Sequence, residues 1–149
     1  MAQTAGLINS SNIRVFSGSA EDSEVNIDKV TECSISVTSD MRDITTKTSG
    51  GFRELLPGLK SASLSVSGFF AEDAANGYNT FAAAQLAGTK LFFLYTHVDA
   101  NGVANAGDEQ FQLAGYITSL EQTAGVEDNV GFSLSVEVTG AVAREVIPV

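Results

Sequence analysis

The side chains best suited to chemistry in this sequence are one cysteine, Cys33, and one histidine, His97. A cysteine nucleophile needs a nearby base, and a catalytic histidine needs both a nucleophile and an acid that orients its ring. No local motif joins the two residues or supplies that acid. We therefore expect Cys33, which alternates with Ile35 and Val37, to be a small buried residue. We expect His97 to lie on the surface or to form a local hydrogen bond.

Other patterns resemble ligand sites but lack a required part. Asp99-Ala100-Asn101-Gly102 resembles the start of a calcium loop without its closing glutamate, so we expect a turn there. Gly50-Gly51 is not followed by the Lys-Ser/Thr pair of a phosphate-binding loop, and no carboxylate motif is typical of a glycosidase. The sequence thus predicts no catalytic, cofactor-binding or metal-binding residue, and we expect that the protein is not an enzyme.

Charge and hydropathy narrow the classes of partner. The 149 residues carry 18 acids and 8 Lys or Arg, for a net charge of −10, which disfavours wrapping of a DNA phosphate backbone. The longest apolar runs, such as residues 91–95, are too short to cross a bilayer, and we see no signal peptide. The length suits one domain, and the single cysteine excludes an internal disulfide.

Three segments alternate hydroxyl and apolar residues, which predicts strands with one polar and one buried face. The hydroxyl positions are Ser34, Ser36 and Thr38; Ser61, Ser63, Ser65 and Ser67; and Ser133, Ser135 and Thr139. Such a face is either a plain solvated surface or the wall of a channel.

These segments belong to a predicted series of strands. We expect strands over residues 12–16, 30–40, 59–70, 90–97, 109–122 and 130–140, and a helix over residues 78–88. Residues 1–11 are expected to form an N-terminal arm, residues 17–28 an acidic loop and residues 141–149 a tail. The fold class is therefore mainly β, an antiparallel β-sandwich or barrel of about five to six strands with one flanking α-helix.

Residues 41–57 form an unusually long predicted connection. Loops beyond ~12–15 residues are uncommon in compact domains and are often functional. This one carries Ile44, Phe52, Leu55 and Leu56, which is too apolar for a disordered linker. The loop either folds back on its own domain or docks on another subunit.

The run from Asp43 to Ala62, followed by a serine-alternating strand ending Ser-Gly-Phe-Phe, resembles the major tail protein of long-tailed bacteriophages. The similar family is typified by lactococcal phage TP901-1 and includes proteins of phage-like gene transfer agents. Gly115-Tyr116-Ile117-Thr118-Ser119-Leu120 and residues 133–140 also resemble it, so the resemblance covers roughly residues 30–142. The acidic segment 17–28 departs from the family.

The resemblance implies a tail-tube fold whose copies form stacked hexameric rings, with strands from each copy closing one barrel around a lumen. DNA would pass through at ejection without specific binding, and an acidic wall would repel its phosphates. The lumen-facing residues would be Glu32, Ser34, Ser36, Asp40, Ser61, Ser63, Ser65, Ser67, Ser133, Ser135 and Glu137.

The same resemblance assigns the loop at residues 41–57 to contacts between subunits and between rings. Phe52, Leu55 and Leu56 would be its apolar anchors, with Arg53 and Glu54 as charged partners. The N-terminal arm and the C-terminal tail are expected to bridge rings as well. Further partners would be the tape measure protein and the tail terminator and distal tail proteins, with no membrane contact. The protein would be assembled in the host bacterial cytoplasm and reside in the virion tail.

Two alternatives remain open at this point. A tube protein of a secretion or injection system, or of a gene transfer agent, would share the ring architecture. A monomeric ligand-binding β-barrel of the lipocalin type would need an enclosed apolar cavity, which the serine-lined strands disfavour.

Overall fold

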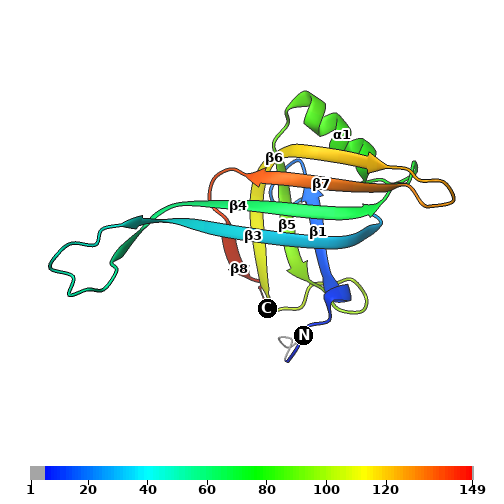
Figure 1. The fold of residues 1–149 in the computed structure, drawn as a ribbon. Helices are drawn as coiled ribbons and strands as arrows, with labels where there is room; N and C mark the ends of the chain where they lie inside the picture. Colours follow the sequence, from blue (N-terminus) through cyan, green and yellow to red (C-terminus); the bar gives the residue numbers. More distant parts are fainter. Residues whose placement is uncertain (1–5, 149) are drawn as a thin grey trace.

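The computed structural model describes residues 6–148, which fold into eight β-strands and one α-helix (Figure 1). The elements are β1 (Ile13–Gly18), β2 (Val25–Asn26), β3 (Val30–Asp43), β4 (Leu55–Phe69), α1 (Tyr78–Ala87), β5 (Leu91–His97), β6 (Glu109–Thr123), β7 (Gly131–Val138) and β8 (Ala143–Val146). A short 3-10 helix, Ser10–Asn12, precedes β1. The predicted class is confirmed, mainly antiparallel β with one helix.

The strand count is higher than predicted because two short strands lie in segments expected to be irregular. β2 lies in the acidic segment and has only two residues, too few to show alternation. β8 lies in the predicted tail and pairs with β6, from Glu109 opposite Val146 to Gln112 opposite Ala143. The six predicted strands and the helix are all present with shifted ends. Residues 1–5 of the predicted N-terminal arm lie outside the described residues.

All strand pairs are antiparallel, in the order β2-β1-β5-β6-β7-β4-β3, with β8 on β6. β6 belongs to two layers. Its first half pairs with β5 and β8, and its second half pairs with β7. In Figure 1, β3, β4, β7 and the end of β6 run side by side, and β1 and β5 cross behind them. We call the first group the outer layer.

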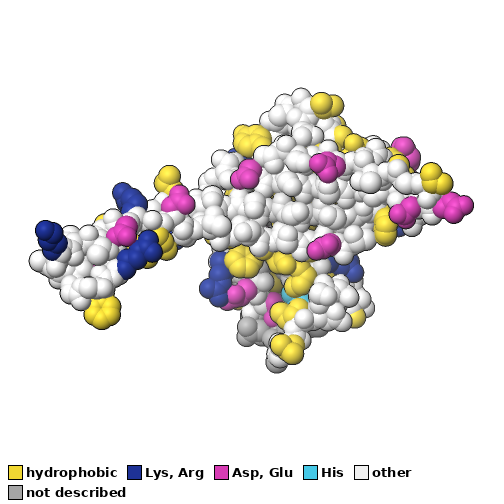
Figure 2. Space-filling model, viewed as in Figure 1, with side chains coloured by type: hydrophobic (Ala, Val, Ile, Leu, Met, Phe, Trp, Pro, Cys, Tyr) yellow, Lys and Arg dark blue, Asp and Glu magenta, His cyan; other side chains and the backbone are white. Residues whose placement is uncertain are grey.

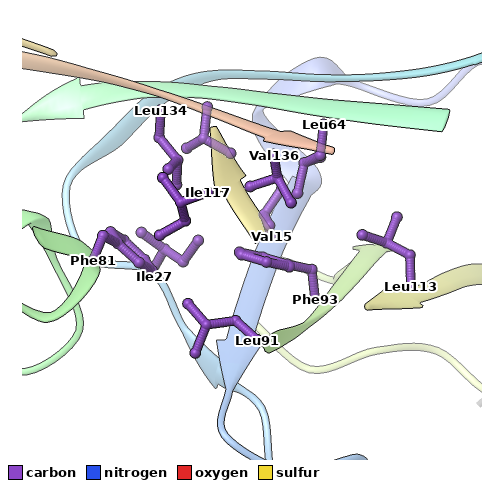
Figure 3. Close-up of a cluster of buried hydrophobic side chains, with 11 residues drawn as sticks. Val15, Ile27, Leu64, Phe81, Leu91, Phe93, Leu113, Ile117, Leu134 and Val136 are labelled. Carbon is purple, nitrogen blue, oxygen red and sulfur yellow. The ribbon is translucent and has the colours of Figure 1, made fainter. Parts of the chain in front are cut away.

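The core lies between the two layers and alternates with the hydroxyl positions. Leu64 and Val66 of β4 and Leu134 and Val136 of β7 are fully buried. They meet Phe93 and residues of β1, β6 and α1 in one cluster, whose labelled side chains converge in Figure 3. Burial of each such side chain stabilises the fold by about 1.5–3 kcal/mol.

Helix α1 packs against β6 and closes one end of this core. Its buried side chain is Phe81, and the helix stops before Gly88, as the sequence predicts. A second set of contacts orders the acidic segment. The Asn76 side chain donates a hydrogen bond to the carbonyl of Val25 at 2.9 Å, and the Asn76 backbone N–H donates to Asp28 at 3.2 Å.

Candidate functional site: a hydroxyl face and a projecting arm

The hydroxyl residues predicted on three strands lie next to one another on the outer layer. The register places Ser34 of β3 opposite Ser65 of β4, Ser65 opposite Ser135 of β7, and Ser135 opposite Ser119 of β6. Parallel rows run from Glu32 through Ser67 and Ser133 to Glu121, and from Ser36 through Ser63 and Glu137 to Tyr116. Thr38 pairs with Ser61, and their hydroxyls lie 2.7 Å apart. The neighbouring residues Leu64, Val66, Leu134 and Val136 are buried, so these rows face away from the core.

Sequence reasoning missed the part of this face that β6 contributes. Tyr116, Ser119 and Glu121 extend the three rows onto a fourth strand. A register irregularity between Ile117 and Ser119 interrupts the alternation of β6. A pattern of period two cannot locate such an irregularity, because the inserted residue moves every later side chain to the other face.

The charges on the three complete rows all have one sign. Glu32, Glu121 and Glu137 occupy their ends or interior, and no Lys or Arg occupies any of these register positions. Asp40, predicted to share this face, lies at a second irregularity, between Ser39 and Met41 of β3. The alternation that places Glu32, Ser34, Ser36 and Thr38 on one face therefore ends before Asp40, and it assigns Asp40 to neither face.

The outer layer has two edges without a partner strand among residues 6–148. β3 pairs only with β4, and residues 116–123 of β6 pair only with β7. At both edges a row of backbone N–H and C=O groups lacks a partner strand among these residues. β3 has 14 residues without Pro or Lys, although monomeric proteins commonly use these residues to block exposed edges. The two edges are therefore suited to pairing with another chain.

The β3–β4 hairpin continues past the domain as an arm, residues 41–60, which extends to the left in Figure 1. The segment 41–57 was predicted as one long connection. Its ends are instead strand, with Met41 opposite Pro57 and Asp43 opposite Leu55. The remaining loop, residues 44–54, does not fold back on the domain.

The arm loop is held by its own hydrogen bonds. Ile44 N–H donates to the Glu54 carbonyl at 2.9 Å, and Glu54 N–H donates to the Thr45 hydroxyl at 2.9 Å. Arg53 Nε donates to Asp43 at 3.1 Å. Hydrogen bonds from Thr45, followed by the bond from Arg53, hold the pKa of Asp43 below its usual value. The tip turns at Gly50 and Gly51, with φ values of 65° and 83° that glycine adopts without steric cost.

The apolar side chains of the arm remain in solvent. Phe52 is 79% exposed and Leu59 is 82% exposed, and the predicted anchors Leu55 and Leu56 are both exposed. Met41 and Ile44 are exposed as well. Figure 2 shows hydrophobic side chains on the arm together with Lys and Arg. An ordered hairpin that leaves this much apolar surface uncovered is typical of an interaction surface.

His97 and Cys33, the two residues first considered for chemistry, are both removed from solvent, His97 almost fully and Cys33 partly. His97 is buried, and its Nδ1 lies 2.9 Å from Asp108, so the local hydrogen bond rather than the surface position is confirmed. Cys33 is partly buried against the core, and burial, followed by the charge of Glu32, raises the pKa of its thiol.

The Asp99 segment is the predicted turn, since Asp99 accepts hydrogen bonds from the N–H groups of Val103 and Asn101. The bond from Val103 is the main reason that the pKa of Asp99 is lowered. The described part of the chain contains no cluster of three metal-ligating side chains. Among residues 6–148, no helix has the length and hydropathy needed to cross a membrane.

Comparisons with known proteins identify the family and the fold. A model of the phage tail tube protein family matches residues 15–144. A search of curated proteins found no match. Among solved structures, a chain in the virion of a native gene transfer agent particle has a TM-score of 0.75 at 20% identity, covering 93% of this chain and 99% of that chain.

The SPP1 tail tube gives a TM-score of 0.72 at 20% identity, covering 96% of this chain and 81% of that chain. A chain in the sheath-tube complex of an extracellular contractile injection system gives a TM-score of 0.65 at 12% identity, with 95% and 93% covered. At these identities the likeness shows a shared fold.

Proposed function

The chain belongs to the family of phage tail tube proteins, components of the virion tail, and from this premise we propose that its outer layer forms the inner wall of the tube. In this proposal, β3 of one copy pairs with the second half of β6 of the next copy. Six copies close a ring, and stacked rings form the conduit through which DNA leaves the virion. The six-fold ring is supported by a similar structure, a gene transfer agent tail described with C6 symmetry.

The observation that carries the proposal is the four-strand outer layer with two free edges and one hydroxyl face. Edge-to-edge pairing would satisfy both rows of exposed backbone groups and leave no edge in the closed barrel. In a monomer these groups would bond to water, and the open edges would remain available for pairing with other chains.

The dimensions of such a barrel suit a DNA duplex. Four strands from each of six copies make about 24 strands. At ~4.8 Å per strand the circumference is at least about 115 Å, which gives a diameter of roughly 37 Å between backbones before strand tilt widens it further. Porins with 16–18 strands already enclose an aqueous channel. The short serine side chains would preserve most of this width.

The chemistry of the proposed wall favours passage over binding. Glu32, Glu121 and Glu137 of every copy would repel phosphates, and no cation on the rows would release counterions from DNA. The function proposed is therefore structural and not catalytic. In the tail, the tube would contact a tape measure protein inside it and terminator and distal tail proteins at its ends, after assembly in the host cytoplasm.

Oligomeric state tests the proposal directly. Purified protein, concentrated stepwise, should convert from monomer to rings and tubes, as measured by size-exclusion chromatography with light scattering and negative-stain microscopy. Tubes with a six-fold axial view are expected. The proposal would be disproved if the protein remained monomeric at the highest soluble concentration and also formed no tubes when tape measure protein was added to nucleate them.

A tube of an injection system is the second candidate, because such tubes share the fold. Purified particles would distinguish the two, since a phage tail releases DNA and an injection tube releases protein. The ligand-binding alternative is not favoured. A groove of about 640 Å³ between β1 and β3 is open and is partly lined by Arg14, Lys29 and Glu32, unlike an enclosed apolar cavity.

A further inference from the structure

The charges of the chain are divided between the arm and the rest of the molecule. The arm, residues 41–60, holds four of the eight basic residues and two of the 18 acids. Its net charge is therefore +2, which leaves −12 on the remainder. Arg53 is paired with Asp43, but Arg42, Lys47 and Lys60 form no ion pair within residues 6–148. The arm thus presents unpaired cations beside exposed apolar side chains.

The opposite end of the outer layer has the complementary character. It is formed by two loops, residues 70–77 and 124–130, which we call the acidic end. The loops are joined by a 2.8 Å hydrogen bond from Phe70 N–H to the Val130 carbonyl. They carry Glu72, Asp73, Glu127 and Asp128, all exposed, and no Lys or Arg, although Lys29 adjoins them through the bond from Phe69 N–H.

The acidic end also has exposed apolar surface. Val126 is 96% exposed, and Phe69, the last residue of β4 directly before the first loop, is 47% exposed. Figure 2 shows acidic and hydrophobic side chains together at this end of the molecule, at the right, and basic and hydrophobic side chains on the arm, at the left. The two ends therefore match in charge and both offer apolar contacts, which is the composition of a specific protein interface.

The two ends cannot meet within one molecule. They lie at opposite ends of β4, whose 15 residues span about 45 Å at ~3.3 Å per residue. An arm can therefore reach only the acidic end of another copy. This contact joins different surfaces and repeats along the strand direction, whereas β3–β6 pairing repeats across the strands.

We propose that the arm of one copy docks on the acidic end of a copy in the next ring, with Arg42 and Lys47 facing Glu72 and Glu127. The inference rests on the proposed tube and adds the identity of the receiving surface. Edge pairing closes each ring, and arm docking stacks the rings. Because an arm cannot dock on an arm, every ring in the stack has the same orientation.

Charge reversal provides a test with an internal rescue. The arm variant carries Arg42→Glu and Lys47→Glu, and the end variant carries Glu72→Lys and Glu127→Lys. Each alone would face like charges at the ring-to-ring contact, so its critical concentration for tube formation should rise about tenfold or more. In a single chain that carries all four changes, the acidic arm of each copy meets the basic end of the next. This four-site variant should therefore form tubes near the wild-type concentration.

A control variant, Glu21→Lys with Glu145→Lys, applies the charge change of the end variant at exposed sites outside both surfaces and should behave as wild type. Circular dichroism would verify the folding of every variant, and size-exclusion chromatography would measure the fraction of protein in rings. If wild-type tubes form but the end variant elongates equally well, or if the four-site variant is not rescued, the docking surface is wrong. If wild-type protein itself forms no ring or tube, the proposed function is wrong.

Discussion

Gly115 lies where β6 passes from one layer of the fold to the other. It pairs with Leu91 of β5 on one side and with Val138 of β7 on the other. A Cβ atom at this position would lie 2.2 Å from the Glu137 carbonyl oxygen, closer than any real contact. The crossing of the two layers, and so the position of the hydroxyl face, depends on this one missing side chain.

We predict that Gly115→Ala destabilises the monomer by about 1–3 kcal/mol or prevents folding, because the backbone of β7 must move to make room. Gly131→Ala is the matched control. Its Cβ would meet no atom closer than 3.6 Å, so we expect a change within about 1 kcal/mol. Urea unfolding of both variants measures the difference. Equal stabilities would contradict the role assigned to Gly115.

The thiol of Cys33 reports on the charge of its neighbour Glu32. Burial and, to a smaller extent, that carboxylate raise the thiol pKa, so alkylation by iodoacetamide should reach half its maximal rate above the usual pH for cysteine. Glu32→Gln removes the like charge and should move the midpoint to lower pH.

The same shift in pKa makes the stability of the folded protein depend on pH. The raised pKa means that the contribution of the neutral thiol to stability is full below the pKa of the unfolded chain. It is lost as the pH rises through the folded-state pKa. A midpoint that stays constant or rises in Glu32→Gln would contradict the proximity of the two groups.

At the scale of elements, the β3–β4 hairpin serves two purposes. Within the domain, its side chains alternate between the core and the hydroxyl face. Beyond the domain, both faces of the hairpin are exposed. The arm keeps its shape through the bonds from Ile44, Glu54 and Arg53, so docking would cost less ordering entropy than docking of a flexible loop.

We predict that Leu55→Asp leaves a folded monomer that does not form tubes. Leu55 is 46% exposed, so its loss should change the free energy of unfolding by less than about 1 kcal/mol. Burial of the new carboxylate at an interface would instead be costly. Leu86→Asp on α1 is the control, since Leu86 is 90% exposed and lies away from the arm. Wild-type tubes formed by Leu55→Asp would exclude this part of the arm from the contact.

At the scale of the whole molecule, the distribution of charge matters more than the total of −10. In the proposed tube, the acids of the outer layer would face the lumen, and the basic residues of the arm would face the next ring. A chain with uniform negative charge would instead oppose its own assembly by self-repulsion.

We predict that wild-type tubes protect no added DNA from nuclease. Tubes carrying Ser65→Arg and Ser135→Arg should protect DNA held inside, and the protection should decrease steeply with salt because phosphate contacts release counterions. Asn79→Arg with Ala83→Arg adds the same charge to exposed positions on α1. DNA bound there should remain sensitive to nuclease. Protection by this control, or none by the serine variants, would place the hydroxyl face outside the tube.

Local patterns predicted most of the elements but not their junctions. The alternation over residues 61–67 and 133–138 predicted two strands and their buried faces, and Gly88 marked the end of the helix. The irregularities at Asp40 and after Ile117 were not predicted, since they depend on how partner strands align. For the same reason, the contribution of β6 to the hydroxyl face was missed.

The sequence by itself determined the class of the fold, the two-faced strands, the acidic charge and the resemblance to phage tail proteins, because each of these depends on composition or on local patterns of residues. The tertiary structure decided which strands are neighbours, and therefore that three separate serine runs become one surface with two open edges. It also decided that residues 41–60 form a hairpin that projects from the domain, because the pairing of β3 with β4 extends past the core. Pairing between distant residues depends on the whole packed core, and no single stretch of sequence contains that information.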